Sequence, residues 1–335
     1  MLDPFILVAI GILTALIFDF GNGLNDAANA ISTVVATRVL SLRSAVLLSA
    51  FFNFVAAFVF SVAVAATIGK GLIDFEAVTT TIVLSGLVGS IVWVYFSSFI
   101  GLPVSASHAL IGGLVGSALV GAGFNSLIVS GILIVFAFIF VAPIIGMIGS
   151  FLFSALVLRL VRNTPPRKVN NLFKRLQLIS VSVYSLGHGT NDAQKTMGII
   201  SLMLFSSGFL GNEFFVPWWV IILSHTTIAL GTIAGGWRVI KTMGTKITKL
   251  RPINGFCAET SGAGVIIAST VFGIPVSTTH VVSGAIMGVG LTKRTSAVHW
   301  SVARNIVWAW VLTIPVTAFV GAISYLILNP IINAL

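Results

Sequence analysis

The residues that decide the fold are two short stretches, each of which occurs twice in the chain. Residues 21–28 read GNGLNDAA, and residues 187–194 read GHGTNDAQ, 166 positions later. Residues 101–108 read GLPVSASH, and residues 273–280 read GIPVSTTH, 172 positions later. Two patterns that recur in the same order at nearly equal offsets indicate an internal duplication.

The sequence around these stretches is typical of a membrane protein. Of its 335 residues, 57% are hydrophobic and only 8% are charged, whereas soluble domains carry about 25% charged residues. Apolar runs recur from end to end, and about 20 such residues cross the roughly 30 Å of hydrocarbon in a bilayer. We therefore predict an all-α polytopic membrane protein with broken helices or re-entrant hairpins and about 10–12 membrane segments.

The basic residues indicate how the two halves are related. The first half spans residues 1–158, a basic linker spans residues 159–175, and the second half spans residues 176–335. Loops that are basic in one half are poor in basic residues at the corresponding place in the other. Because basic loops stay in the cytoplasm, this alternation predicts two repeats of inverted topology.

Placing the basic linker in the cytoplasm also leads to the location and the partners that we expect for the protein. It places 16 of the 18 basic residues in the cytoplasm, so the net charge of +10 orients the chain and predicts no nucleic-acid partner. We expect a multi-pass protein of a prokaryotic inner membrane, in contact with the lipid bilayer. A homodimer is left open, and no cofactor is expected.

The Asn-Asp pair in each half is the candidate cation site. Asp26 and Asp192 lie in apolar sequence, where an ionised carboxylate costs about 2.5–3.5 kcal/mol. Such a carboxylate persists where it meets a cation or lines a polar cavity. The neighbouring glycines are expected to loosen the helix and free backbone carbonyls, which would join Asn25 and Asn191 as oxygen ligands for sodium. The alternative is a structural polar contact between helices.

The Pro-Val-Ser stretch in each half is the candidate phosphate site. A proline near a helix start, followed by hydroxyl residues, predicts a half-helix whose unpaired N–H groups and O–H donors attract an anion. Two such ends would bind a tetrahedral oxyanion between them. The alternative is that the hydroxyls only bond to the preceding turn. The candidate phosphate-binding residues are Ser105, Ser107, Ser277, Thr278 and Thr279, together with the motif asparagines Asn25 and Asn191.

Five further polar residues have two interpretations each. His108 and His280 bind substrate or relay protons, but packing is favoured, and His188 is a weaker candidate because Asn22 stands at its place in the first half. Glu259 is a third cation ligand, or it pairs with Arg251 or Lys249 at the membrane edge. Lys195 neutralises Asp192 or snorkels to the interface, and snorkelling is favoured.

Electrostatics links the two candidate sites. Two aspartates would repel phosphate, so anion and carboxylates share a dry site only when cations lie between them. This requirement predicts symport of phosphate with a cation, and the oxygen-rich ligands favour sodium over protons.

At these motifs the chain resembles the inorganic phosphate transporter (PiT) family. That family carries a Gly-x-Asn-Asp-x-Ala-Asn-Ala signature in each half, and here residues 23–30 read GLNDAANA and residues 189–196 read GTNDAQKT. The resemblance implies cation-coupled phosphate uptake by alternating access, with the candidate residues above lining the site and Glu259 matching a functional glutamate. Two departures, Asn53 in place of a glutamate and the second ending QKT, leave the coupling ion and its stoichiometry open.

Four alternatives to sodium-coupled phosphate transport are considered. The resemblance also covers proton-coupled phosphate carriers and sulfate permeases. An intramembrane aspartyl hydrolase would use Asp26 and Asp192 as a dyad that shares one proton. A channel is disfavoured, because broken inverted repeats with charged centres are typical of gated carriers.

Overall fold

The described part of the chain is a bundle of helices. The computed structural model describes residues 3–59 and 61–334, and no β-strand is assigned within them. It contains twelve α-helices there, or ten if each of two bent pairs is counted once. The first half forms α1 (Pro4–Ala36), α2 (Leu42–Val55), α3 (Ala63–Lys70), α4 (Thr80–Ile100), α5 (Ala106–Ala122) and α6 (Val129–Leu160). The second half forms α7 (Pro166–Ser206), α8 (Trp218–Ala234), α9 (Trp237–Lys241), α10 (Pro252–Val271), α11 (Thr278–Leu291) and α12 (Trp300–Ala334).

Four of these helices, α1, α4, α6 and α12, are long and apolar enough to cross a membrane by themselves. Two bent pairs, α2 with α3 and α8 with the segment after it, reach that length together. Large apolar side chains such as Phe99, Leu160 and Phe319 lie on the outer surface, where lipid and not water is the favourable neighbour. The predicted all-α polytopic membrane class with broken helices is confirmed.

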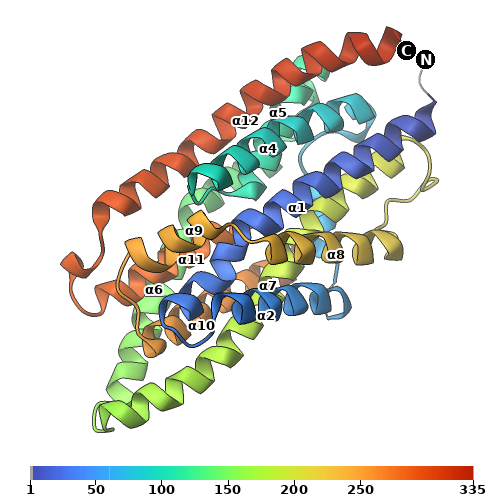
Figure 1. Ribbon diagram of the computed structural model, residues 1–335. Coiled ribbons are helices and arrows are strands. Elements are labelled where there is room, and N and C mark those ends of the chain that lie inside the picture. Colours follow the sequence, from blue (N-terminus) through green and yellow to red (C-terminus); the bar gives the residue numbers. More distant parts are fainter. Residues whose placement is uncertain (1–2, 60, 335) are drawn as a thin grey trace.

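The start of α1 and the end of α12 lie at one end of the molecule, and the basic linker lies at the other. Figure 1 shows the start of α1 beside the end of α12, and the turn from α6 to α7 at the far end. Pro165 and Pro166 open α7, which fits the preference of proline for the first turn of a helix. This placement agrees with termini on one side of a membrane and the linker on the other.

Two helical hairpins bring the half-helices to the middle of the bundle. Helix α4 ends at Gly101 and α10 ends just before Gly273, and both glycines have the positive φ that favours glycine at a helix C-terminus. After four residues the chain starts α5 and α11, which pack back on α4 and α10. Each half-helix therefore presents its N-terminus to the interior.

Each half-helix also packs against the last helix of the other half. Helix α5 contacts α12, and α11 contacts α6. Glycines make both approaches close: a Cβ at Gly116 would lie 1.9 Å from the Ala318 carbonyl oxygen, and a Cβ at Gly284 would lie 2.1 Å from that of Pro143. Small residues at such crossings are typical of membrane helices. The two halves of the sequence are thus interleaved in space.

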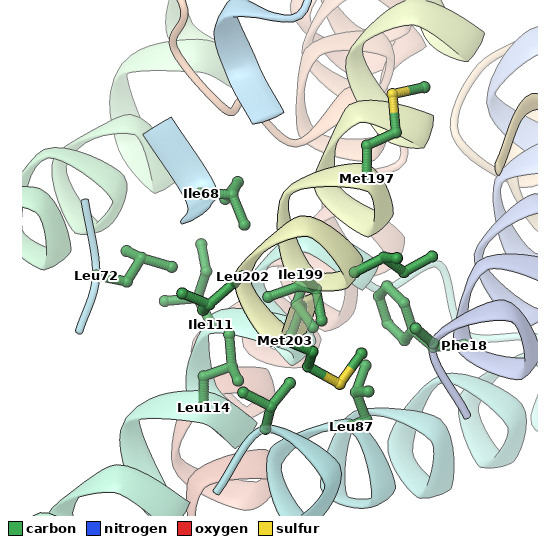
Figure 2. Packing of buried hydrophobic residues seen from close by; sticks show 14 of the residues in the cluster. Phe18, Ile68, Leu72, Leu87, Ile111, Leu114, Met197, Ile199, Leu202 and Met203 are labelled. Atoms are coloured by element: carbon green, nitrogen blue, oxygen red, sulfur yellow. The ribbon is translucent and has the colours of Figure 1, made fainter. Parts of the chain in front are cut away.

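Two apolar clusters enclose a polar layer. The first cluster includes Phe18 of α1 and Met197 of α7 (Figure 2), and the second includes Ala28 of α1 and Tyr184 of α7. Along both helices the polar signature residues lie between members of the two clusters. Apolar packing therefore closes the site from both ends.

Candidate functional site

The two signatures lie in the middle of unbroken helices. Helix α1 runs through residues 21–30 and α7 runs through residues 187–196 without interruption. The expectation that glycines there loosen the helix and free carbonyls is wrong. The glycines allow close helix packing instead, because a Cβ at Gly23 would lie 2.3 Å from the Ile228 carbonyl oxygen and one at Gly189 would lie 2.6 Å from the Asn53 Cα. The free carbonyls are found at the hairpin turns.

The Asp26 carboxylate is surrounded by neutral donors. Its Oδ1 accepts hydrogen bonds from Asn25 Nδ2 at 2.7 Å and Thr279 Oγ1 at 3.1 Å, and its Oδ2 accepts one from Thr278 Oγ1 at 3.1 Å. Only 2% of the residue is exposed. The nearest ionisable nitrogen, His188 Nε2, is 4.0 Å away. A buried carboxylate in these surroundings attracts a cation.

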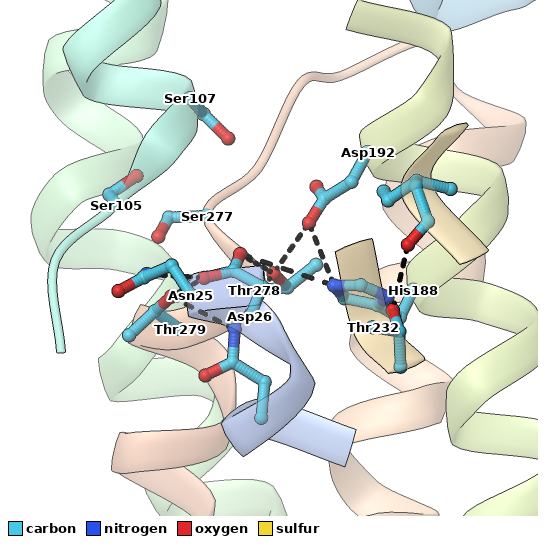
Figure 3. Close-up of polar contacts among 12 residues, drawn as sticks. Asn25, Asp26, Ser105, Ser107, His188, Asp192, Thr232, Ser277, Thr278 and Thr279 are labelled. Atoms are coloured by element: carbon cyan, nitrogen blue, oxygen red, sulfur yellow. Dashed lines mark hydrogen bonds and ion pairs between the residues drawn. The ribbon is translucent and has the colours of Figure 1, made fainter. Parts of the chain in front are cut away.

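The Asp192 carboxylate has different neighbours. Its Oδ1 accepts a hydrogen bond from the Lys195 ammonium. Its Oδ2 lies 2.9 Å from Thr278 Oγ1 and 3.1 Å from His188 Nε2. Figure 3 shows both carboxylates, His188 and Thr278 converging from α1, α7 and α11. One ligand atom each of Asp26, His188 and Asp192 lies within 4.8 Å of the others, close enough to hold one ion.

Lys195 contradicts the prediction that it snorkels. Its side chain is buried, and its ammonium donates to Ser107 Oγ and to the Val276 carbonyl oxygen at 2.9 Å, as well as to Asp192. The open alternative, neutralisation of Asp192, is what the structure shows.

His188 occupies a more central place than the sequence indicates. Its Nδ1 lies 3.1 Å from Asn53 Oδ1, and Asn53 Nδ2 donates to Thr232 Oγ1 at 2.9 Å. This chain of contacts fixes the imidazole ring so that Nε2 faces the two aspartates. Because Asn22 stands at this place in the first half, the duplication directed attention away from His188.

The hydroxyl residues of the two hairpins meet at the same place. Ser105 and Ser277 are the N-caps of α5 and α11, and their Oγ atoms accept from the backbone N–H of His108 and His280. Ser107 Oγ donates to the Val276 carbonyl oxygen at 3.4 Å. Thr279 Oγ1 lies 3.1 Å from both the Val104 carbonyl oxygen and Asp26 Oδ1, so its one hydrogen is shared between these two acceptors.

The N-termini of α5 and α11 are therefore adjacent, and a hydroxyl of each contacts the turn that precedes the other. The candidates Ser105, Ser107, Ser277, Thr278 and Thr279 are brought together with the aspartates, and all are at most 5% exposed.

The two motif asparagines are not equivalent. Asn25 Nδ2 donates to Val104 O at 3.1 Å, and its Oδ1 accepts from Ser98 Oγ. Asn191 Nδ2 donates to Thr270 Oγ1 at 2.9 Å, and its Oδ1 has no hydrogen-bond partner among the described residues. Asn191 Nδ2 also lies 3.5 Å from the Ile274 carbonyl oxygen, so each asparagine contacts the helix and the turn of the hairpin in its own half, and only Asn25 is also seen to donate to its neighbouring aspartate.

Glu259 lies in a separate polar pocket. It accepts hydrogen bonds from Thr33, Gln177 and Ser180 and is wholly buried. The alternative of an ion pair with Arg251 or Lys249 is wrong, since no such pair is found in the described part of the chain. Thr33 follows Asp26 by seven residues on one face of α1, which places this pocket about 10 Å along the helix from the aspartates.

His108 and His280 of the two half-helices pack against each other, in agreement with the packing role favoured from the sequence. The rings of His108 and His280 lie 4.7 Å apart, and the His280 ring stacks on Trp310 at 3.8 Å between centroids. Neither ring has a carboxylate partner within the described residues.

Sequence reasoning missed Asn29 and Asp19. Asn29 Nδ2 donates to Thr279 Oγ1 at 2.9 Å, and buried Asp19 accepts from Thr196 Oγ1 at 2.8 Å. Asn29 stands inside the repeated signature, which was a usable signal. Asp19 precedes Asp26 by seven residues on the same helix face, a spacing that also indicated it.

Comparisons with known proteins show which proteins this chain is similar to. The sequence pattern described as "Phosphate transporter family" matches residues 22–321. A protein of Rhizobium meliloti named "Probable low-affinity inorganic phosphate transporter" is 52% identical over 94% of both chains. A protein of the same name from Bacillus subtilis is 40% identical over 97% of this chain and 98% of its own. A solved structure described as "The sodium-dependent phosphate transporter" is 27% identical, with a TM-score of 0.87 over 97% of this chain and 99% of the other.

Proposed function

The chain belongs to the phosphate transporter family, and from this premise we propose that it carries inorganic phosphate together with sodium by alternating access. It is a multi-pass membrane transporter and not an enzyme, so the aspartyl hydrolase interpretation is set aside. The observation that carries the proposal is the buried Asp26 carboxylate, which has only neutral donors and lies against the N-terminus of α11, beside the turn that precedes α5.

The phosphate position is proposed at these two N-termini. The first backbone N–H groups of a helix lack partners within it, and the helix dipole adds positive potential there. The hydroxyls of Ser107 and Thr279 now donate to hairpin carbonyls at 3.4 and 3.1 Å, and they would turn to phosphate oxygens when the anion enters. Four oxygens of a tetrahedral anion suit donors that arrive from two opposed hairpins.

Cation coupling follows from the charges at the site. Asp26 and Asp192 carry two negative charges, Lys195 contributes one positive charge, and phosphate adds one or two negative charges. In a site closed by apolar packing this excess repels the anion unless a further cation binds. Sodium suits the oxygen atoms around Asp26, and the solved relative is described as sodium-dependent.

Asp26, Asp192 and Asn25 are the proposed sodium ligands, and Glu259 supplies a second proposed cation position. Asn191 is a further proposed ligand, because its buried Oδ1 has no hydrogen-bond partner among the described residues while its Nδ2 donates to Thr270 Oγ1.

Alternating access is supported by the arrangement of the two halves. The site lies between two apolar clusters, each of which closes one route to it. Each hairpin packs on the final helix of the opposite half. In repeats of inverted topology, the proposed relation of residues 1–158 and 176–335, the two routes would open in turn by equivalent movements. The cytoplasmic placement of the basic linker belongs to the same proposal, as does a prokaryotic inner membrane.

The test is uptake of radiolabelled phosphate by the purified protein in proteoliposomes. An inward sodium gradient is expected to drive phosphate accumulation that stops when choline replaces sodium, and excess sulfate is expected not to compete. Accumulation that ignores sodium but follows an imposed pH gradient would establish the proton-coupled alternative. Competition by sulfate at equal concentration would make the chain a sulfate permease.

A further inference from the structure

The two signatures place different residues at one position of the repeat. Asn29 follows Asp26 by three residues, and Lys195 follows Asp192 by three residues. Asn29 donates to Thr279, and Lys195 donates to Ser107, which is the residue of the other hairpin at the same repeat position. The two side chains therefore make equivalent contacts, but only one of them carries a charge.

The Lys195 ammonium occupies the place of a bound cation. Its three partners are a carboxylate oxygen of Asp192, the hydroxyl oxygen of Ser107 and the carbonyl oxygen of Val276. An ammonium has three N–H donors, so these partners satisfy it completely. Carboxylate, hydroxyl and carbonyl oxygens are also the ligands that a sodium ion would take at this place. The residue is 0% exposed, so the ammonium is bound by protein oxygens and is shielded from bulk water.

We infer that Lys195 is a tethered cation that replaces one coupling ion at the second aspartate. Asp26, whose donors are all neutral, needs a free cation before phosphate binds, whereas Asp192 is already compensated. The chain thus takes up one cation fewer for each phosphate than it would with asparagine at position 195. This inference rests on the proposed cation symport and specifies its stoichiometry.

A tethered cation changes the energetics of transport as well as the ion count. The ammonium moves with the protein and returns with it, so it supplies local charge without drawing on an ion gradient. Each phosphate is then driven by fewer ions, and the accumulation that a given gradient supports is smaller.

The test replaces Lys195 with asparagine, the residue found at the corresponding position 29 of the first half. Lys195→Asn gives the second signature the residue of the first, and phosphate uptake is measured against sodium concentration in proteoliposomes. The variant is expected to need more sodium, and its Hill coefficient for sodium is expected to rise by about one because a second free cation now binds with phosphate. Lys70→Asn, which removes an exposed lysine that lies over the Phe214 ring, is the matched control and should keep the wild-type curve.

A double variant keeps the test decisive if the single change unfolds the protein. In Asp192→Asn with Lys195→Asn both charges of the buried pair are absent, so no second cation is required and the wild-type Hill coefficient is expected. A single variant that is active with an unchanged sodium dependence would overturn the inference. So would a double variant that folds and needs more sodium than the wild type.

If the proposed symport of phosphate with sodium is itself wrong, the wild-type protein will show it. If wild-type protein takes up no phosphate, the transport function itself is wrong. If it takes up phosphate with protons, the same variants are measured against pH, and an unchanged proton dependence in Lys195→Asn overturns the tethered cation alone.

Discussion

The signature of α1 and the signature of α7 are similar in sequence, but the groups around their aspartates differ in charge. Around Asp26 the donors are Asn25, Thr278 and Thr279, all neutral. Around Asp192 the neighbouring groups are the Lys195 ammonium, the Thr278 hydroxyl and His188 Nε2, of which the first carries a charge. Both carboxylates are equally buried, so burial does not distinguish them. One half is thereby suited to bind an exchangeable cation and the other to hold a permanent one.

The hairpins that face these signatures differ less. Both have a serine N-cap and a hydroxyl residue two positions later. In each hairpin this second hydroxyl lies within hydrogen-bond distance of a carbonyl oxygen in the turn of the other hairpin. The one added group is Thr278, which stands where the first half has Ala106 and which contacts both carboxylates. The proposed phosphate donors are thus nearly symmetric between the two halves, whereas the proposed cation ligands are not.

The largest expected effect concerns the orientation of the two halves. In a Cys257→Ser background, single cysteines replacing Asn212 and Thr164 are expected to react with an impermeant thiol reagent from opposite faces of the membrane, each all or none. The reason is that the basic linker and the loop after α7 lie on opposite sides in an inverted repeat. Labelling of both from one face would remove the basis for comparing the halves.

Asp26→Asn is expected to have the next largest effect. Loss of the charge that holds the exchangeable cation costs about 3–5 kcal/mol, as when one member of a buried pair is removed, so phosphate affinity in sodium should fall by about 100-fold or more. Isothermal titration of the purified variant with phosphate measures this change.

Asp192→Asn is the matched comparison for Asp26→Asn. It leaves the Lys195 ammonium without its carboxylate and should lower thermal stability more than Asp26→Asn does. If both variants are folded, as shown by a monodisperse peak in detergent, and both transport phosphate with normal sodium dependence, the site assignment is wrong. Equal losses of stability would contradict the distinction between the two aspartates.

His188→Asn copies Asn22 into the second half and should have a moderate effect. The imidazole Nε2 contacts Asp192 and faces Asp26, so its loss removes a fixed polar partner worth about 1–2 kcal/mol. Sodium affinity, measured from the sodium dependence of uptake, is expected to fall by about tenfold. A variant with unchanged sodium affinity would reduce His188 to a packing residue.

Ser105→Ala and Ser277→Ala should give the smallest effects, and similar ones in the two halves. Each change removes one hydroxyl donor and one helix N-cap, worth about 1 kcal/mol each. Phosphate affinity is expected to fall by about fivefold and the melting temperature by a few degrees, with little change in sodium affinity. A large loss of sodium affinity in either variant would show that the hydroxyls bind the cation.

Much of this arrangement was predictable because it follows from the lipid surroundings of the helices and from the two repeated sequence stretches. The apolar runs required helices, and the repeated Pro-Val-Ser stretches marked the two half-helix starts, which the structure places at Ala106 and Thr278. Buried aspartates in apolar sequence indicated the site, because such groups are expensive without a partner.

The parts that could not be predicted depend on distances between helices. Lys195 was expected to snorkel because nothing in the sequence shows that Val276 and Ser107, 81 and 88 positions away, lie beside it. His188 was undervalued because its contact with Asn53, 135 positions earlier, comes only from the packing of α2 on α7. Comparison of the two repeated stretches identified the residues that the halves share, but it undervalued Lys195 and His188, which occur in the second half alone.

The most direct test is the effect of sodium on equilibrium phosphate binding by purified protein, without transport. If cation and anion share the site, the phosphate dissociation constant should fall at least about tenfold as sodium replaces choline at constant ionic strength, and phosphate should tighten sodium binding by the same factor. In Asp26→Asn this dependence should disappear. Wild-type protein that binds phosphate equally well with and without sodium would contradict the coupling proposed here.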